Sequence, residues 1–194
     1  MVRCWEPRDA PALKEAVDSS LDHLLPWMRW AAREPQPLEE KVELLRRLRG
    51  QFDLGEDFVY GLFSRDEDVA VGGSGLHRRI GENGLEIGYW LRANRVGEGL
   101  VTESTAALTR VAFEVCGVDR VAIHVDPENE RSALIPRRLG FVEEARLRRR
   151  LPAYEPGGEP RDMIVFVLFR DAFPGSPAAS APLEAFDAAG TRVL

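Results

Sequence analysis

The sequence predicts a mixed α/β sheet domain. Some segments repeat apolar residues at the spacing of an amphipathic helix, whereas others are short runs of β-branched and aromatic residues bounded by glycine, asparagine and aspartate. The chain of 194 residues, 44% of them hydrophobic, is long enough to bury one substantial core. Its two cysteines are far apart, and no apolar run approaches the ~18–20 residues of a membrane span. These features argue against a disulfide framework, a disordered chain and a membrane-spanning protein.

The first half of the domain is expected to combine two helices with a meander. Asp9 suits the N-cap of a helix over 9–21, and apolar residues at helical spacing predict a second helix over 38–52. Between them, 23–32 is an apolar, tryptophan-rich stretch that Pro26 interrupts. Turn residues then separate short runs of strand character, which predict a three-stranded antiparallel meander. The strands of this meander are expected over 58–63, 69–76 and 85–91. A further short strand is expected near the start of the chain, over 2–5.

The second half is expected to alternate helices and strands. We expect a helix over 101–115, a strand over 118–125 and a helix over 129–139, which Gly140 ends. Extended chain follows from Phe141, and a nearly continuous apolar run predicts an interior strand over 162–170. One domain over 1–170 is therefore expected. An extension over 171–194 has a linker-like start, and its last segment is expected to form a hairpin or helix that docks on the domain or on a dimer partner.

The charge of the chain excludes one class of partner. Basic residues number 26 and acidic residues 32, which gives a net charge of −6, and only two of the basic residues are lysine. Codon bias in a GC-rich genome is the simplest account of so much arginine. An acidic chain argues against nonspecific nucleic-acid binding. The stretch 92–150 nevertheless has a net charge of +2, which permits one local phosphate site.

A glycine-containing turn is the first candidate site. Asn94 to Leu100 lies between an expected strand and an expected helix, and it contains Gly97 and Gly99. Such a turn exposes backbone N–H groups in front of a helix N-terminus, where an anion binds well. The segment lacks the third glycine of a dinucleotide-binding loop and the lysine of a P-loop. An ordinary strand–helix turn would have the same residues, so this pattern leaves both interpretations open.

A second motif, at the expected helix over 129–139, favours one interpretation of the glycine-containing turn. Asn129 and Ser132 begin the expected helix, and Leu139-Gly140-Phe141 ends it. In this order and spacing, the two segments resemble the GNAT superfamily of acetyl-coenzyme A-dependent N-acetyltransferases. The family pattern is Gln/Arg-x-x-Gly-x-Gly/Ala, then Asn-x-x-Ser about thirty residues later and Leu-Gly-Phe; Asn94 departs from its first position. The run from Glu86 to Leu91 resembles the branch that acetylates the N-terminal amines of ribosomal proteins.

The resemblance implies a fold and a co-substrate. The fold is the GNAT acyl-CoA N-acyltransferase fold, a central mixed, mostly antiparallel sheet flanked by helices. Acetyl-CoA would place its pyrophosphate on the backbone N–H groups of Arg95 to Leu100, and the backbone of Leu91 would bond near the acetyl carbonyl. The residues implied to bind the cofactor are Leu91, Asn94, Arg95, Val96, Gly97, Glu98, Gly99, Leu100, Asn129 and Ser132. No metal is implied.

Two residues are candidates for proton transfer in a direct attack of an amine on the thioester. Glu86 is the candidate base, although it could instead be the partner of an arginine. Many GNAT enzymes have a tyrosine acid where this chain has Pro136, and the related branch implies Ser132 as the donor to the leaving thiolate. Ser132 could equally be a helix-start hydroxyl. Because proline has no N–H, we expect a local kink or an unpaired Ser132 carbonyl at Pro136, with 3₁₀ or loop geometry there.

Aromatic side chains are expected near the acceptor. By resemblance, Trp27, Trp30 and Tyr154 would wall its pocket, although two or more of them could be core residues. His124 is interpreted as a packing residue. We expect a cytoplasmic homodimer that acts on a primary amine, either a protein N-terminus or a small molecule, without nucleic-acid or membrane partners. The alternative is a noncatalytic acyl-CoA-binding regulatory module on the same fold.

Overall fold

The computed structural model describes residues 1–154 and 157–194, which form two compact units. The first unit contains Met1–His77 and Gly88–Val101, and the second contains Arg78–Ile87 and Thr102–Leu194. Strand β4 (Gly84–Leu91) is the one strand that passes through both units. The seven strands have the order β1-β2-β3-β4-β5-β7-β6, which confirms the expected mixed α/β class.

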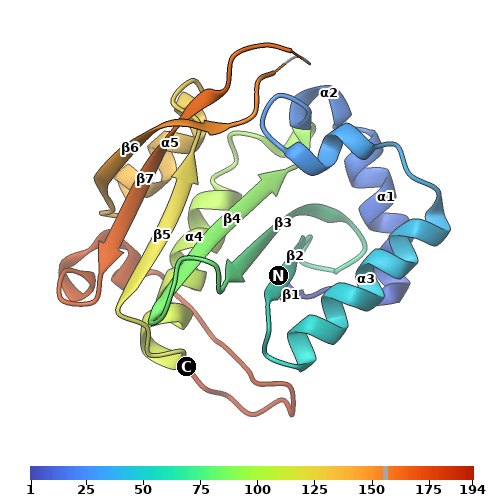
Figure 1. The fold of residues 1–194 in the computed structure, drawn as a ribbon. Helices are drawn as coiled ribbons and strands as arrows, with labels where there is room; N and C mark the ends of the chain where they lie inside the picture. Colours follow the sequence, from blue (N-terminus) through green and yellow to red (C-terminus); the bar gives the residue numbers. More distant parts are fainter. Residues whose placement is uncertain (155–156) are drawn as a thin grey trace. The chain divides into compact units, whose positions relative to one another are not determined.

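The first unit places helices against a small sheet. Strands β1 (Val2–Cys4), β2 (Phe58–Phe63) and β3 (Ala70–His77) run antiparallel in sequence order. Helices α1 (Ala10–Asp18) and α3 (Leu38–Asp53) pack side by side, as Figure 1 shows in blue and cyan. Apolar residues on their inner faces form one cluster with strand residues, because both helices are amphipathic. The short helix α2 (Leu21–Leu24) and a 3₁₀ turn over Arg29–Arg33 lie between them in the sequence.

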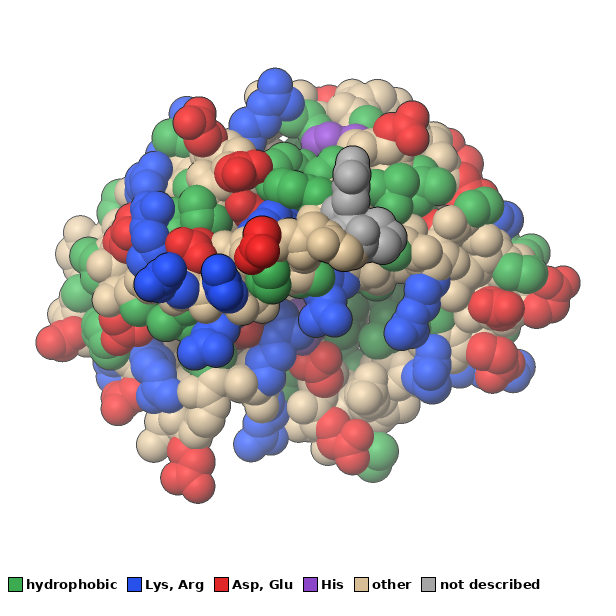
Figure 2. All heavy atoms as spheres, turned by 45° about the horizontal axis from the view of Figure 1, so that its top comes forward, with side chains coloured by type: hydrophobic (Ala, Val, Ile, Leu, Met, Phe, Trp, Pro, Cys, Tyr) green, Lys and Arg blue, Asp and Glu red, His purple; other side chains and the backbone are tan. Residues whose placement is uncertain are grey.

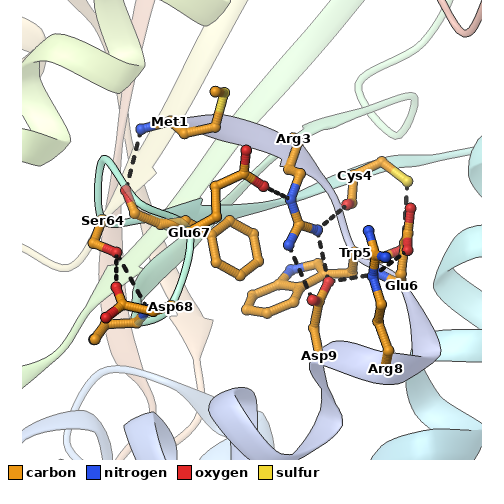
Figure 3. A network of polar contacts seen from close by, with 12 residues as sticks. Met1, Arg3, Cys4, Trp5, Glu6, Arg8, Asp9, Ser64, Glu67 and Asp68 are labelled. Carbon is orange, nitrogen blue, oxygen red and sulfur yellow. Dashed lines mark hydrogen bonds and ion pairs between the residues drawn. The ribbon is translucent and has the colours of Figure 1, made fainter.

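A charged network fixes the start of the chain to this unit (Figure 3). The guanidinium of Arg3 donates to both oxygens of Asp9, at 2.7 and 3.0 Å, and to Glu67 at 2.6 Å. It also lies 3.9 Å from the centroid of the Phe63 ring. The network joins β1, the beginning of α1 and the loop after β2.

The only two lysines of the chain hold the same segment. Lys41 of α3 is 1% exposed and forms an ion pair with Glu34, whose side chain is 4% exposed. The other oxygen of Glu34 accepts the N–H of Gln36 at 3.0 Å. The Nζ of Lys14 donates to the carbonyl of Gln36 at 2.9 Å and to Asp18 at 2.6 Å. Helices α1 and α3 thus both fasten residues 34–36 through an ammonium group.

The second unit is built on antiparallel and parallel pairs. Strand β5 (Arg120–Val125) is parallel to the first half of β4 and antiparallel to β7 (Arg161–Phe169), which pairs with β6 (Val142–Leu151). Strand β7 is buried over five consecutive residues, as its continuous apolar run predicts. Helix α4 (Leu100–Arg110) begins in the first unit and continues in the second. Helix α5 (Glu130–Arg138) contacts β5.

The C-terminal extension contacts α4 and the turn that follows it. Phe173 is 8% exposed and stacks on Phe113, with ring centroids 4.6 Å apart. The guanidinium of Arg110 donates to the carbonyl of Ala181 at 2.9 Å. Two short 3₁₀ turns lie between these contacts, and an antiparallel bridge from Phe186 to Arg192 closes a small hairpin.

Three local expectations differ from the structure. The segment 9–21 divides, because α1 ends at Asp18 and α2 begins at Leu21. The helix over 101–115 is α-helical only to Arg110 and then forms a π-helical turn, in which the N–H of Cys116 bonds to Val111. The 3₁₀ or loop geometry expected at Pro136 is wrong, since α5 remains α-helical to Arg138.

A buried proline explains the last difference. Pro136 is enclosed by its surroundings, and its fixed φ is compatible with a helix. Its carbonyl accepts the N–H groups of Leu139 and Phe141 at 3.1 and 3.0 Å, which closes the helix one turn later.

Charges are mixed on the surface. Figure 2 shows acidic and basic side chains interspersed on the face in view. None of the described helices combines the length and the apolar character of a membrane span.

Candidate active site

The glycine turn has the geometry of an open anion loop. A 3₁₀ turn over Ala93–Arg95 leads into it, and α4 begins directly after it, at Leu100. Gly97 has φ +93° and Gly99 has φ +82°, values that side chains disfavour. A Cβ added to either glycine would meet no atom within 4 Å, so the space beside both is open. Exposed backbone therefore lies immediately before a helix N-terminus.

The loop carries an ion pair of its own. Arg95 donates to both oxygens of Glu98, at 2.7 and 2.8 Å, and these hydrogen bonds lower the pKa of the Glu98 carboxyl. The N–H of Arg95 is engaged by the carbonyl of Arg92 at 3.1 Å. The N–H groups after Arg95 are therefore the ones that the turn could direct at an anion.

The residue before the loop is anchored on α1 and the turn that follows it. Arg92 is 9% exposed and donates twice to Glu15, at 2.6 Å each. The N–H of Ala93 donates to the hydroxyl of Ser20 at 3.1 Å. The backbone N–H of Arg92 bonds to Val71 of β3, and the neighbouring Leu91 is 8% exposed. These contacts hold the end of β4, and with it the start of the loop.

Aromatic rings stack where β3 is rich in glycine. Trp30 is 38% exposed and meets Trp90 edge to face, with centroids 5.7 Å apart. A Cβ on Gly73 would lie 2.4 Å from Nε1 of Trp90, so only glycine leaves room for this ring. Trp27 is half-buried and donates its backbone N–H to Leu24. The half-exposed Trp30 thus contacts Trp90 of β4, which itself packs against the core cluster of the first unit.

Glu86 is buried and held by two basic side chains. Its side chain is 7% exposed, and Arg79 donates to both of its oxygens at 2.8 and 2.5 Å. Nδ1 of His124 lies 3.2 Å from one of them. An adjacent guanidinium favours the ionised carboxylate. The alternative interpretation of Glu86 as an arginine partner is therefore realised in the structure, together with a histidine contact that the sequence did not indicate.

Helix α5 begins with the expected cap. Oδ1 of Asn129 accepts the backbone N–H of Ser132 at 3.1 Å. Ser132 is half-buried in the first turn. The Asn-x-x-Ser pair therefore acts locally as a cap, whatever further role the serine has.

Tyr154 belongs to a charged cluster after β6. Its hydroxyl donates to Glu128 at 3.1 Å, and its ring lies 3.7 Å from the guanidinium carbon of Arg161. Partial burial and the hydrogen bond to Glu128 raise the pKa of Tyr154 to about 12. Arg161 also pairs with the buried Asp126. Tyr154 is thus fixed as a hydrogen-bond donor.

The candidates fall into two sets, one in each unit. The tryptophans, Leu91 and the loop from Asn94 to Leu100 lie in the first unit, whereas Glu86, Asn129, Ser132 and Tyr154 lie in the second. Sequence reasoning missed Arg79 and dismissed His124. Alternation along β5 predicts that His124 and Ala122 lie on the same face of the strand. The sequence does not show that Ala122 is the register partner of Glu86, and this pairing is what places His124 near Glu86.

Comparison with known proteins identifies the family of the chain. Residues 1–142 match the model of the acetyltransferase (GNAT) domain. The chain is 28% identical over 175 residues to YdaF of Bacillus subtilis, which bears the name of a ribosomal N-acetyltransferase; the match covers 90% of this chain and 93% of YdaF. It is 26% identical over 149 residues to the ribosomal protein uS5-alanine N-acetyltransferase of Escherichia coli, covering 74% and 75%.

A solved structure gives the same result. RimJ of Mycobacterium smegmatis, in complex with a CoA disulfide, superposes with a TM-score of 0.78 at 26% identity, over 92% of this chain and 85% of RimJ. A noncatalytic acyl-CoA-binding module is not favoured, because the named relatives are acetyltransferases. With the domain matched over most of its length, the chain belongs to the GNAT acetyltransferases, enzymes that transfer the acetyl group of acetyl-CoA to an amine.

Proposed function

We propose that this enzyme acetylates a primary amine, a protein N-terminus or a small molecule, by direct attack on acetyl-CoA. The observation that carries the proposal is the open loop with two left-handed glycines at the start of α4. It supplies what a pyrophosphate needs, namely backbone donors, a helix N-terminus and free space.

The co-substrate is assigned to specific groups. The backbone N–H groups from Val96 to Leu100 would receive the pyrophosphate, with Asn94 and Arg95 beside it. Asn129 and Ser132 would contribute from the start of α5. The N–H of Leu91 would stabilise the negative charge that develops on the acetyl oxygen during attack.

Proton transfer is assigned to candidate residues of the second unit. Glu86 is the carboxylate that accepts the amine proton, directly or through water, and Ser132 donates to the leaving sulfur. Trp27, Trp30 and Tyr154 form the aromatic wall of the acceptor site. The exposure of Trp30 and Tyr154, at 38% and 46%, supports their access to an acceptor.

The acceptor class follows the relatives. Since a relative at 26% identity is named for N-acetylation of an alanine of ribosomal protein uS5, a peptide with N-terminal alanine is the first acceptor to try. We propose a cytoplasmic homodimer, with residues 1–170 as the catalytic domain and 171–194 as an extension docked on it. The buried contact of Phe173 supports this docking. Neither nucleic acid nor membrane is proposed as a partner.

A thiol-release assay tests the proposal. The enzyme is incubated with acetyl-CoA and a panel of alanyl peptides, seryl peptides, polyamines and amino-acid amides, and free CoA is measured. We expect turnover with at least one amine and a loss of it in Glu86→Gln. Glu184→Gln, in a tail side chain that is 65% exposed, is the matched control and should keep wild-type turnover. Tight acetyl-CoA binding without turnover on any amine would contradict the proposal.

A further inference from the structure

The contact between Glu86 and His124 goes beyond the roles assigned so far. The register Glu86↔Ala122 sets the two strands side by side, and alternation puts His124 on the same face as Ala122. Nδ1 of His124 then lies 3.2 Å from Oε2 of Glu86. Two adjacent parallel strands thus present a carboxylate and an imidazole as a pair.

Access differs within this pair. The side chain of Glu86 is 7% exposed, whereas that of His124 is 25% exposed. Arg79 occupies both oxygens of the carboxylate. The imidazole is therefore the more solvent-accessible member of the pair.

The pairing also prepares the imidazole chemically. A carboxylate that accepts Nδ1–H leaves the lone pair on Nε2 and stabilises the imidazolium once it forms. The charged groups placed against His124 are Glu86 of β4 and, behind it, Arg79 from the segment before β4. On the other side, its register partner on β7 is the apolar Val165. Among the described residues, Glu86 is thus a negative partner for a protonated ring.

We propose that His124 is the general base of acetyl transfer and that Glu86 is a positioning residue that acts through it. The inference rests on the proposed function. The amine nitrogen forms a bond to the acetyl carbon, its proton passes to Nε2 of His124, and the carbon–sulfur bond breaks with its electron pair on sulfur. Sulfur takes a proton from Ser132, which recovers one from water as the imidazolium releases its own.

His124→Asn is the decisive variant. The asparagine amide can still donate to Glu86 from near the position of Nδ1, but it offers no base. We expect kcat to fall roughly 10²–10³-fold, the affinity for acetyl-CoA to stay unchanged, and the shape of the pH–rate profile to differ from that of the wild type. His124→Ala should regain activity with added imidazole. His77→Asn is the matched control, since His77 makes the same kind of pair with Asp57, at 2.8 Å, elsewhere.

Combination and spectroscopy complete the test. Because the two residues act as one unit, Glu86→Gln should cost little more in the His124→Asn background. Nitrogen NMR of the wild-type enzyme, which needs no acceptor substrate, should show neutral His124 protonated at Nδ1. Neutral His124 protonated at Nε2 would overturn the inference. Wild-type turnover that His124→Asn leaves intact would also overturn it. No turnover by the wild type would instead contradict the proposed function.

Discussion

Asp9 links the stability of the first unit to pH. Burial acts to raise its pKa, but the hydrogen bonds from Arg3 and from the Glu6 N–H outweigh burial and lower it. A carboxyl whose pKa is lower in the folded state adds stability above its unfolded pKa, about 3.9, and loses it as the pH falls through the folded value. The ionised carboxylate of Asp9 therefore stabilises the folded state at neutral pH, and this stabilisation is lost in acid.

Asp9→Asn should lower the free energy of unfolding by about 2 kcal/mol at pH 7. The difference from the wild type should shrink as the pH falls below about 4 toward the lowered folded-state pKa, through which wild-type Asp9 also becomes neutral. Urea unfolding between pH 3 and pH 7 measures this. The exposed Asp22→Asn serves as control and should change little. A constant difference across this pH range would contradict the role of the Asp9 charge.

Gly97 tests the anion loop at the level of one backbone angle. Its φ of +93° strains any side chain, and an added Cβ would enter the open space beside the loop. Gly97→Ala should weaken acetyl-CoA binding about tenfold or more, equivalent to 1.4 kcal/mol, as measured by calorimetry. Gly50→Ala, at a glycine in α3 with a negative φ and open space, should leave this affinity unchanged. Equal affinities for both variants would argue against the loop as the pyrophosphate site.

At the scale of elements, the buried ion pair between Lys41 of α3 and Glu34, which follows the 3₁₀ turn, is expected to stabilise the packing of this segment on α3. Lys41→Met leaves the carboxylate of Glu34 buried without its partner, which should cost about 3–5 kcal/mol. Adding Glu34→Gln should recover most of this loss. Lys14→Met, in a pair whose side chains are 31% and 34% exposed, should cost less than about 1 kcal/mol. Urea unfolding of the four proteins separates these effects, and equal losses for the two lysines would contradict the buried pair.

Most elements follow from local pattern, and their bounds agree to within a few residues. The strand over 58–63 matches β2, because apolar and aromatic residues stand between clear turn signals. The division between α1 and α2 and the π-helical turn after Arg110 were not predicted. Both places have contacts with residues distant in the sequence, since Ser20 accepts the N–H of Ala93 and the carbonyl of Phe113 accepts a hydrogen bond from Arg170. Motif spacing located the glycine loop and the capped start of α5. The contact of Glu86 with His124 required the pairing of β4 with β5, which no local pattern specifies.

For the whole molecule, the extension is expected to contribute to stability. Phe173→Ala removes a ring that stacks on Phe113 and should lower the free energy of unfolding by about 3 kcal/mol. Phe186→Ala, in a side chain that is 59% exposed, should have little effect. Chemical unfolding and size-exclusion chromatography of both variants measure stability and assembly. An unchanged stability in Phe173→Ala would show that the extension is only loosely attached.

Acetyl thioesters also react without catalysis, and lysine ammonium groups that lose a proton are their usual targets in proteins. This enzyme uses arginine for 24 of its 26 basic residues, and guanidinium groups remain protonated. Of its two lysines, Lys41 is enclosed with Glu34, and Lys14 is engaged by Asp18 and the Gln36 carbonyl. The contacts of the two lysines with residues 34–36 thus have a chemical consequence, because they leave little free lysine amine to react with the acetyl thioester that the enzyme uses.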